Sequence, residues 1–166
     1  NGDIYQGEWK NGNREGEGIE ILNNGERYEG SFMDNYYHGK GRYTWPDGAE
    51  YEGDWVKDVS HGTGTLKCAS GNIYEGGWKD DERDGNGILT LVNGDKYQGI
   101  WKENDLQSVE KVYYANGDTY EGEIDDNLQK HGEGVLTYKN GDKYEGNWLN
   151  DKQHGKRREI CKRIFE

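Results

Sequence analysis

Four histidines, His38, His61, His131 and His154, are the residues whose type suggests metal binding or catalysis, and each stands one residue before a glycine. They occupy one point of a repeating pattern. If the pattern stacks as paired strands, equivalent positions lie about 9.6 Å apart, whereas ligands of one metal ion lie about 2 Å from it. No nucleophile or orienting group recurs beside them. The histidines therefore predict a structural role, without metal binding or catalysis.

Carboxylates also recur along the chain, mostly as a glutamate between a tyrosine and a glycine, as at Glu29, Glu52 and Glu75. A calcium ion needs several oxygens within about 2.6 Å, and a ladder spaced by about 9.6 Å cannot supply them. The acidic loop 80–85 opens like a calcium-binding EF-hand loop, but Leu91 stands where its closing glutamate belongs. Each Gly-x-Gly opens a strand, so it is not a phosphate-binding turn. The sequence predicts no enzyme activity and no cofactor.

The element that positions these side chains is a repeat marked by Tyr-x-Gly, which recurs every 23 residues with one step of 24. A fixed period of this length is typical of stacked supersecondary units, each too small to bury an apolar face alone. The tyrosines are Tyr5, Tyr28, Tyr51, Tyr74, Tyr97, Tyr120 and Tyr144.

Each repeat predicts two antiparallel strands. In the first, the tyrosine, the glycine and an aromatic residue two positions later share one face. A polar loop of about six residues, a Gly-x-Gly and a second strand of alternating character follow, and a tight turn such as Asn93-Gly94 ends the unit. The predicted fold class is all-β: an elongated, single-layer antiparallel β-hairpin repeat solenoid.

Leu, Ile, Val and Phe make up only 25 of 166 residues, about 15%, which is below the roughly 20% expected of a globular chain. The aromatic residues must therefore supply the core. One layer cannot bury both faces of every ring, and exposed aromatic surface marks partner sites. We therefore predict an aromatic groove that binds a partner. Its predicted residues are Tyr28, Tyr51, Trp55, Tyr74, Trp78, Tyr97, Trp101 and Tyr120.

These motifs resemble the MORN repeat (membrane occupation and recognition nexus), with Tyr-Glu-Gly-x-Trp, a polar loop, His-Gly-x-Gly and Asp/Asn-Gly. The repeats from Tyr51, with His61-Gly62-Thr63-Gly64, and from Tyr144, with His154-Gly155, fit closely. We assign residues 1–155 to seven such repeats. The resemblance implies a twisted hairpin solenoid that acts as a protein-binding scaffold. Members occur in axonemal radial spokes, cytoskeletal collars, junctional membrane complexes and myosin adaptors, and as appendages of lipid kinases and methyltransferases.

The pattern breaks in the fifth and sixth repeats, where Ser108-Val109-Glu110 replaces Gly-x-Gly and Ile124 replaces the aromatic residue. We predict an irregular region at 103–131. Two interpretations stay open: a drifted repeat that only changes the local twist, and a feature specific to one partner.

Residues 156–166 abandon the repeat and place Ile160, Ile164 and Phe165 on one stripe of a basic amphipathic helix. A helix this short needs a surface to dock on. We expect a short C-terminal helix that caps Trp148, whose strand lacks a second strand in this interpretation. The alternative is that its basic face binds a partner or an anionic membrane.

The net charge of −12 disfavours nucleic acid and favours a basic or helical peptide segment of a protein partner in a larger complex. The acidic array opposes anionic lipid, and only the tail favours it.

Two distant cysteines and the lack of a long apolar run or leader predict a cytoplasmic protein, with a cytoskeletal or ciliary setting from the resemblance. Since the chain begins inside a turn, we expect a fragment. The alternative functions are membrane tethering and an accessory array of a larger enzyme.

Overall fold

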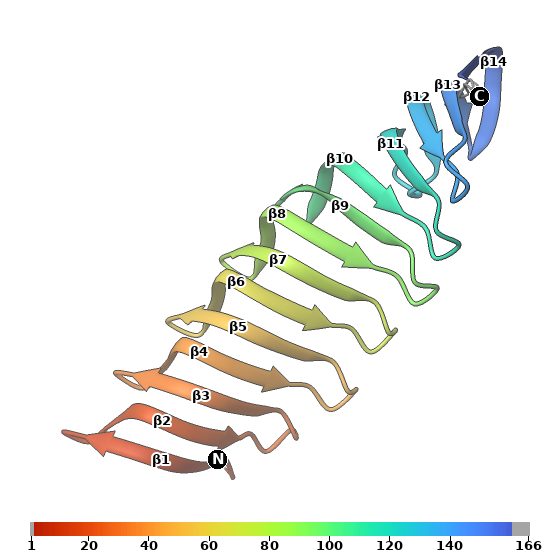
Figure 1. The fold of residues 1–166 in the computed structure, drawn as a ribbon. Helices are drawn as coiled ribbons and strands as arrows, with labels where there is room; N and C mark the ends of the chain where they lie inside the picture. The colour runs from red at the N-terminus through yellow and green to blue at the C-terminus, as the bar shows by residue number, and fades with distance from the viewer. Residues whose placement is uncertain (1, 161–166) are drawn as a thin grey trace.

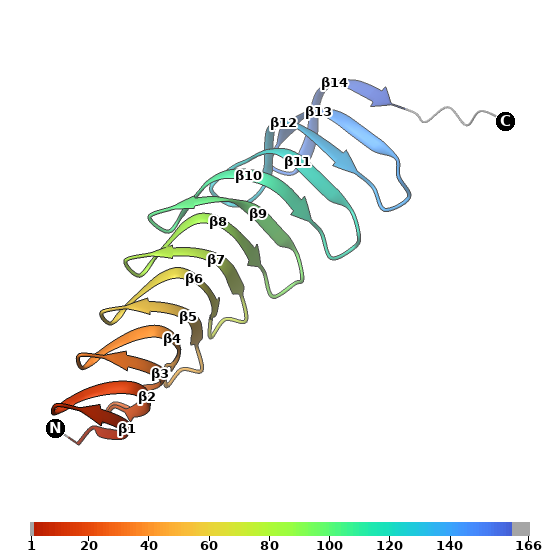
Figure 2. The same ribbon diagram turned by 60° about the vertical axis from the view of Figure 1, so that its left-hand side comes forward.

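The computed structural model describes residues 2–160, with side chains described as far as residue 155. It shows fourteen strands in one antiparallel sheet whose spatial order follows the chain, so each strand pairs with its sequence neighbours (Figure 1). Figure 2 shows the hairpins stacked along an elongated, twisted ribbon. The predicted single-layer all-β array is confirmed. The strands are β1 (Ile4–Lys10), β2 (Asn13–Ile21), β3 (Arg27–Met33), β4 (Tyr36–Thr44), β5 (Glu50–Val56), β6 (Val59–Lys67), β7 (Ile73–Lys79), β8 (Glu82–Thr90), β9 (Lys96–Lys102), β10 (Asp105–Tyr113), β11 (Thr119–Ile124), β12 (Lys130–Thr137), β13 (Lys143–Leu149) and β14 (Lys152–Ile160).

The turn inside most hairpins has two residues, where a polar loop of about six was predicted. Asp34 and Asn35, between β3 and β4, have φ of 49° and 73°. Two successive positive φ values define the type I′ turn, whose twist matches that of paired strands. Pairing continues up to the turn, from Met33 to Tyr36, so the polar residues belong to the strands.

The second residue of each such turn also joins one repeat to the previous one. The carboxylate of Asp58 accepts a hydrogen bond from the backbone N–H of Tyr37 at 2.7 Å, and its own N–H donates to the Tyr37 carbonyl at 3.1 Å. Asn35, Asp81, Asn104 and Asp151 make the same pair of contacts 21 residues back along the chain. This edge of the sheet is therefore held by side chains as well as by backbone pairing.

We expect Asp58→Ala to lower the free energy of unfolding by about 1–2 kcal/mol, because the Tyr37 N–H loses its side-chain acceptor. Asp58→Asn is the control, since Asn35 and Asn104 accept the equivalent bond elsewhere in the array, and it should stay within about 0.5 kcal/mol of wild type. Urea denaturation of both variants measures the difference. Equal losses would show that the amide oxygen does not replace the carboxylate.

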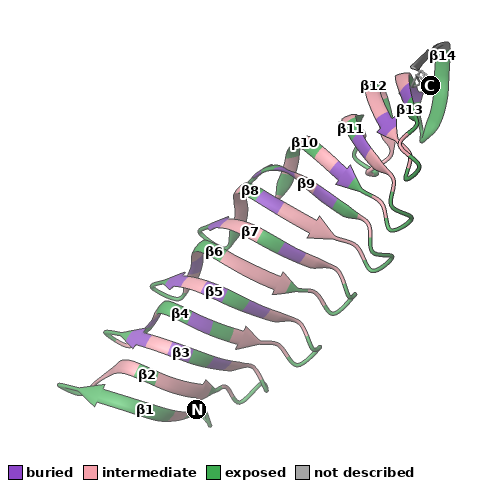
Figure 3. Cartoon of the chain, viewed as in Figure 1, coloured by how far each residue is buried: buried purple, intermediate pink, exposed green. Residues whose placement is uncertain are grey.

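Buried positions recur along the strands (Figure 3). In five repeats the tyrosine, Tyr5, Tyr28, Tyr51, Tyr74 or Tyr120, packs over a pair of glycines on adjacent strands. A Cβ atom added at Gly41 would meet the Tyr28 hydroxyl at 2.2 Å, so only glycine admits this ring. The tryptophan of the next repeat then covers the tyrosine edge to face: the Tyr28 and Trp55 ring centroids are 5.5 Å apart. The Trp55 indole N–H donates to the Gly41 carbonyl at 3.1 Å. Each repeat is therefore completed by the one that follows it.

The irregular region predicted at 103–131 is confirmed. β10 and β11 share only two paired positions, Val112 with Tyr120 and Tyr113 with Thr119, and the aromatic core divides there into two clusters. The extra residue of the sixth repeat lengthens the loop after β11. Leu128 in that loop packs into the second cluster, and its carbonyl accepts a hydrogen bond from the Tyr97 hydroxyl at 3.4 Å. This loop covers Tyr97 where Ile124 replaces the usual tryptophan.

The predicted helix at the C-terminus is wrong over residues 156–160, which belong to β14. Asn150 and Asp151 form the usual two-residue turn, with φ of 50° and 64°. The chain can therefore pair with the free edge of β13 although the glycine pattern has ended. Trp148 pairs with Gln153 and is 4% exposed, so it needs no cap. Ile160 lies in β14, whereas Ile164 and Phe165 lie outside the described residues.

Candidate functional site

The eight aromatic residues predicted to line a partner groove are all buried, with exposed fractions of 0% to 7%. Their rings form the core, because the tyrosines and tryptophans of adjacent repeats pack on one another, and Tyr97 is covered by Leu128 instead. Tyr51, Trp55 and Trp78 also reach the floor of a surface pocket. The structure thus brings three of the eight to one candidate site and leaves the other five as core.

The pocket has a volume of about 680 Å³ and lies on the aromatic face over the second to fourth repeats. Its walls are the half-buried side chains of Tyr43, Trp45, Leu66 and Cys68. We call it the aromatic pocket, lined by Tyr37, Tyr43, Trp45, Asp47, Ala49, Tyr51, Trp55, Asp58, Ser60, Leu66, Cys68, Ala69, Trp78 and Asp81. The walls come from second strands and the loops that follow them, so each repeat presents about two such side chains.

These wall residues are not among the residues predicted to line the groove, although the sequence carries a signal for them. Tyr43, Leu66 and their equivalents alternate after the second glycine of each repeat, which is the pattern of a half-buried strand. Residues at these positions keep part of their apolar surface accessible to a partner. The aromatic residues of the Tyr-x-Gly-x-Trp motif, in contrast, are buried in the core. The half-buried column is therefore the better sequence marker of a binding face in this array.

Three carboxylates, Asp47, Asp58 and Asp81, line the aromatic pocket, which gives it an acidic character. The Tyr43 hydroxyl donates to Glu26 at 2.6 Å. Burial, and then this hydrogen bond, raises the pKa of Tyr43 above its ordinary value of 10. Its hydroxyl therefore stays protonated. The pocket combines aromatic surface with negative charge, an arrangement that suits a cationic side chain.

The opposite face of the sheet has a larger hollow of about 980 Å³, lined by polar residues and glycine backbone. Its cations are already paired: Lys40 lies 2.7 Å from Asp54, and Arg42 forms an ion pair with Glu50. Glu52 and Glu75 also line this hollow and stay exposed. Because the described residues that line the hollow include no aromatic side chain to anchor a partner, this face is a poorer candidate for partner binding than the aromatic pocket.

The Glu50 ion pairs predict a pH dependence of stability. Hydrogen bonds from Arg42, and then from Lys67, lower the pKa of Glu50 below its ordinary value of 4.5. The folded pKa is the lower one, so this contribution is complete above about pH 4.5 and is lost as the pH falls through the folded value. We expect Glu50→Gln to reduce the acid dependence of Tm in thermal unfolding. Glu75→Gln, at an exposed glutamate outside these pairs, should leave the dependence unchanged; identical profiles for both variants would contradict the assignment.

Among the described side chains, residues 2–155, no group of three or more His, Cys, Asp or Glu converges to hold a metal ion. The four histidines, for which a structural role was predicted, all lie in strands. The Nδ1 atom of His61, for example, is 3.7 Å from the Asp80 carboxylate. The described part of the chain offers no helix of the length and apolarity that crossing a bilayer requires.

Comparison with known families finds a match to the family model described as the MORN repeat at residues 5–27, 28–50, 51–73, 74–96, 120–143 and 144–156. The unmatched stretch, 97–119, is the repeat that lacks Gly-x-Gly. No curated protein matches the chain.

Several solved structures resemble the fold, two of which are the following. One is the TCP domain of SAS-4 (dCPAP) from Drosophila melanogaster, in complex with a proline-rich motif of Ana2 (dSTIL), with 17% identity and a TM-score of 0.47 over 80% of this chain and 78% of that one. The other is the TCP10 domain of Danio rerio CPAP with a STIL peptide, with 15% identity and a TM-score of 0.43 over 86% and 68%. Likeness at this level says nothing about what this chain binds.

Proposed function

Since this chain belongs to the MORN-repeat family, we propose that it is a non-catalytic scaffold that binds a segment of a protein partner in the aromatic pocket. The observation that carries the proposal is the pocket itself, which leaves Tyr43, Trp45 and Leu66 half-buried on a face that spans several hairpins. Half-buried aromatic side chains in a concave site are the usual anchors of protein interfaces.

The charge of the pocket supports a basic partner segment. Asp47, Asp58 and Asp81 lie among its lining residues, and the chain carries a net charge of −12. Complementary charge accelerates association and selects against acidic partners. The same balance disfavours nucleic acid. We place the scaffold in the cytoplasm, in a cytoskeletal or ciliary assembly, as the family resemblance suggests.

Site-specific photo-crosslinking tests the proposal in cells. A photo-crosslinking residue in place of Ala69, which lines the aromatic pocket, should capture a discrete partner protein. The same residue in place of Thr63, on the polar face, should not capture it. Mass spectrometry of the crosslinked peptide would place the partner segment in the pocket.

The mutational arm uses Trp45→Ser, which removes a half-buried wall residue. Loss of an interface tryptophan costs about 2 kcal/mol or more, so recovery of the crosslinked partner should fall about 30-fold. Thr65→Ser, on the opposite face, is the control, and both variants must melt as wild type does. Equal capture from Ala69 and Thr63, or full recovery with Trp45→Ser, would refute binding in the pocket.

A further inference from the structure

One position of the repeat lies between two aromatic rings and changes residue type along the array. It stands nine residues after the repeat tyrosine, or ten in the sixth repeat. In four repeats its side chain, from Arg14, Tyr37, Arg83 or Lys130, lies over the tyrosine of its own repeat and the tryptophan or phenylalanine of the next. The residues are Arg14, Tyr37, Ser60, Arg83, Leu106, Lys130 and Gln153.

In the first and fourth repeats an arginine fills this position. The Arg83 guanidinium carbon lies 4.5 Å from the Trp101 ring centroid and 5.6 Å from that of Tyr74. Its Nη2 donates to the Asn104 carbonyl at 2.8 Å. Arg14 lies over Tyr5 and Phe32 at 5.6 Å and 5.1 Å in the same way. The array therefore contains an aromatic site that binds guanidinium from its own chain.

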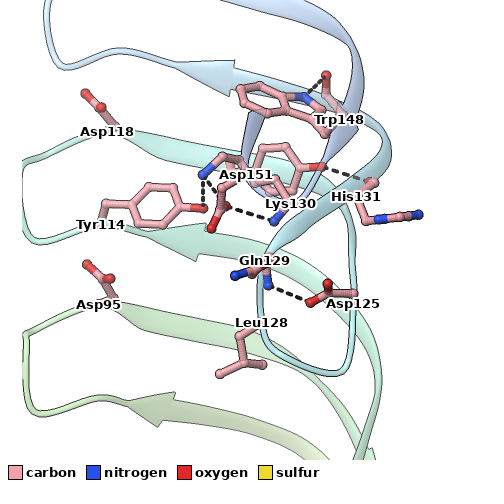
Figure 4. A network of polar contacts seen from close by, with 12 residues as sticks. Asp95, Tyr114, Asp118, Asp125, Leu128, Gln129, Lys130, His131, Trp148 and Asp151 are labelled. Atoms are coloured by element: carbon pink, nitrogen blue, oxygen red, sulfur yellow. Dashed lines mark hydrogen bonds and ion pairs between the residues drawn. The ribbon is translucent and has the colours of Figure 1, made fainter. Parts of the chain in front are cut away.

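In the sixth repeat a lysine fills it, as Figure 4 shows. Lys130 Nζ lies 5.3 Å from the Trp148 ring centroid and 4.8 Å from that of Tyr114. Its counter-ion is Asp151, 2.8 Å away, which is the second residue of the following turn. The lysine side chain is only 13% exposed, so the site holds a nearly buried cation by rings and a carboxylate together.

The third repeat has the same site without a cation. The Tyr51 and Trp78 rings meet edge to face at 5.0 Å and 81°, close to the 5.2 Å and 78° of Tyr74 and Trp101. The turn supplies Asp81, the equivalent of Asp151. The residue between the rings is Ser60, which is 5% exposed and whose backbone N–H donates to Asp81 at 2.7 Å. The rings beside it are also largely covered, with Tyr51 2% and Trp78 7% exposed. Ser60, Tyr51, Trp78 and Asp81 all line the aromatic pocket.

We propose that the aromatic pocket binds an arginine side chain of the partner over Ser60, in the place that Arg83 and Arg14 fill in their own repeats. This inference rests on the proposed function and names the chemistry of its site. The guanidinium enters the pocket beside Ser60, contacts the part of Trp78 that the pocket leaves accessible, and donates to the exposed Asp81 carboxylate. Arginine fits better than lysine because a planar guanidinium can stack and donate to two acceptors at once. The nearby Asp58 and Asp47 add negative charge.

Titration of the full chain with N-acetyl-arginine amide, followed by NMR, tests the site without the partner. The Trp78 indole N–H, which donates to the Gly64 carbonyl at 3.1 Å, is the reporter. We expect a saturable shift of this resonance. N-acetyl-citrulline amide has nearly the same shape without the charge and should bind about tenfold more weakly. No saturable shift, or equal affinity for citrulline, would overturn the proposal; tighter binding of N-acetyl-lysine amide would overturn the choice of arginine.

Three variants separate this site from nonspecific binding. Ser60→Arg supplies the cation from the chain itself, as in the fourth repeat, and should abolish the Trp78 response. Asp81→Asn keeps the backbone contact that Asn104 makes to Arg83 and should weaken arginine binding about tenfold. Arg83→Ser combined with Asn104→Asp should create a second site with an equivalent ring pair and carboxylate, read at the Trp101 indole, and so tests the idea even if Ser60→Arg does not fold. Undiminished shifts in the first two variants, or no response at Trp101 in the third, would refute it.

The proposed function can fail separately. If photo-crosslinking places a partner in the pocket but Ser60→Arg captures it fully, the arginine site is refuted and the scaffold function stands. If N-acetyl-arginine amide binds as expected but no partner crosslinks from Ala69, the site is supported and the scaffold function fails.

Discussion

Trp78→Ala should lower the free energy of unfolding by about 3–5 kcal/mol, whereas Trp9→Ala should lower it by no more than about 1 kcal/mol. Both tryptophans occupy the same position of the Tyr-x-Gly-x-Trp motif. Trp78 is 7% exposed and Trp9 is 60% exposed. The pair therefore compares one residue type at one motif position with and without burial.

The difference arises from the neighbouring repeat. Trp78 packs edge to face on Tyr51 and on Tyr74, with ring centroids 5.0 Å and 5.4 Å away, and its indole N–H donates to Gly64 at 3.1 Å. Trp9 packs only on Tyr5 within the described part of the chain, at 5.1 Å. Truncation of Trp78 therefore leaves a cavity and removes a buried hydrogen bond, and truncation of Trp9 does neither.

Urea denaturation followed by circular dichroism measures both variants. Since each repeat contacts mainly its neighbours, loss of Trp78 should also weaken coupling between the halves of the array and broaden the transition. Equal losses for Trp78→Ala and Trp9→Ala would show that the tryptophan stabilises its own hairpin and not the contact between repeats.

Gly64→Ala is expected to cost about 2–3 kcal/mol, although it adds a single methyl group. The new Cβ atom would lie 2.4 Å from the Tyr51 hydroxyl oxygen and 2.6 Å from two ring carbons. Contacts this short force the ring away from the glycine pair. Tyr51 is 2% exposed, so the displaced ring has no free space in the core and must disturb Trp55 and Trp78.

A double-mutant cycle with Tyr51→Leu isolates the cause. Leucine lacks the outer ring atoms that the new methyl group would meet, so Gly64→Ala should cost less than about 1 kcal/mol in that background. Thermal and urea unfolding of the four proteins give the interaction energy. An unchanged cost in the Tyr51→Leu background would mean that the methyl group acts through the backbone and not through the tyrosine ring.

The variants also bear on the candidate site. Replacing Trp55, Trp78 or Trp101 would not test partner binding by itself, because all three are core residues and their loss removes stability first. Trp45 and Leu66, which are half-buried on the pocket wall, are the positions at which binding can be changed with the least disturbance of the core. The column that stabilises the array and the column that faces a partner are adjacent but separate.

The sequence by itself determined the period, the two strands of each repeat and the face that carries the aromatic residues. These properties are local: Tyr51, Gly53 and Trp55 alternate on one strand, and alternation places them on one face whatever lies beside them. It also located the irregular region, because Ser108 and Ile124 break a pattern that the neighbouring repeats keep.

Only the tertiary structure decided which rings are buried, because a tryptophan is covered by a repeat that lies 23 residues away in the chain. Trp9 and Trp78 have the same motif and opposite exposure for this reason. The extra strand at Lys152–Ile160 formed because the edge of β13 was available, which the stripe of Ile160 could not reveal. The aromatic pocket has the same origin: Ser60 is an ordinary strand residue in the sequence, and only the stacking of the third and fourth repeats places it beside Tyr51, Trp78 and Asp81 in one pocket.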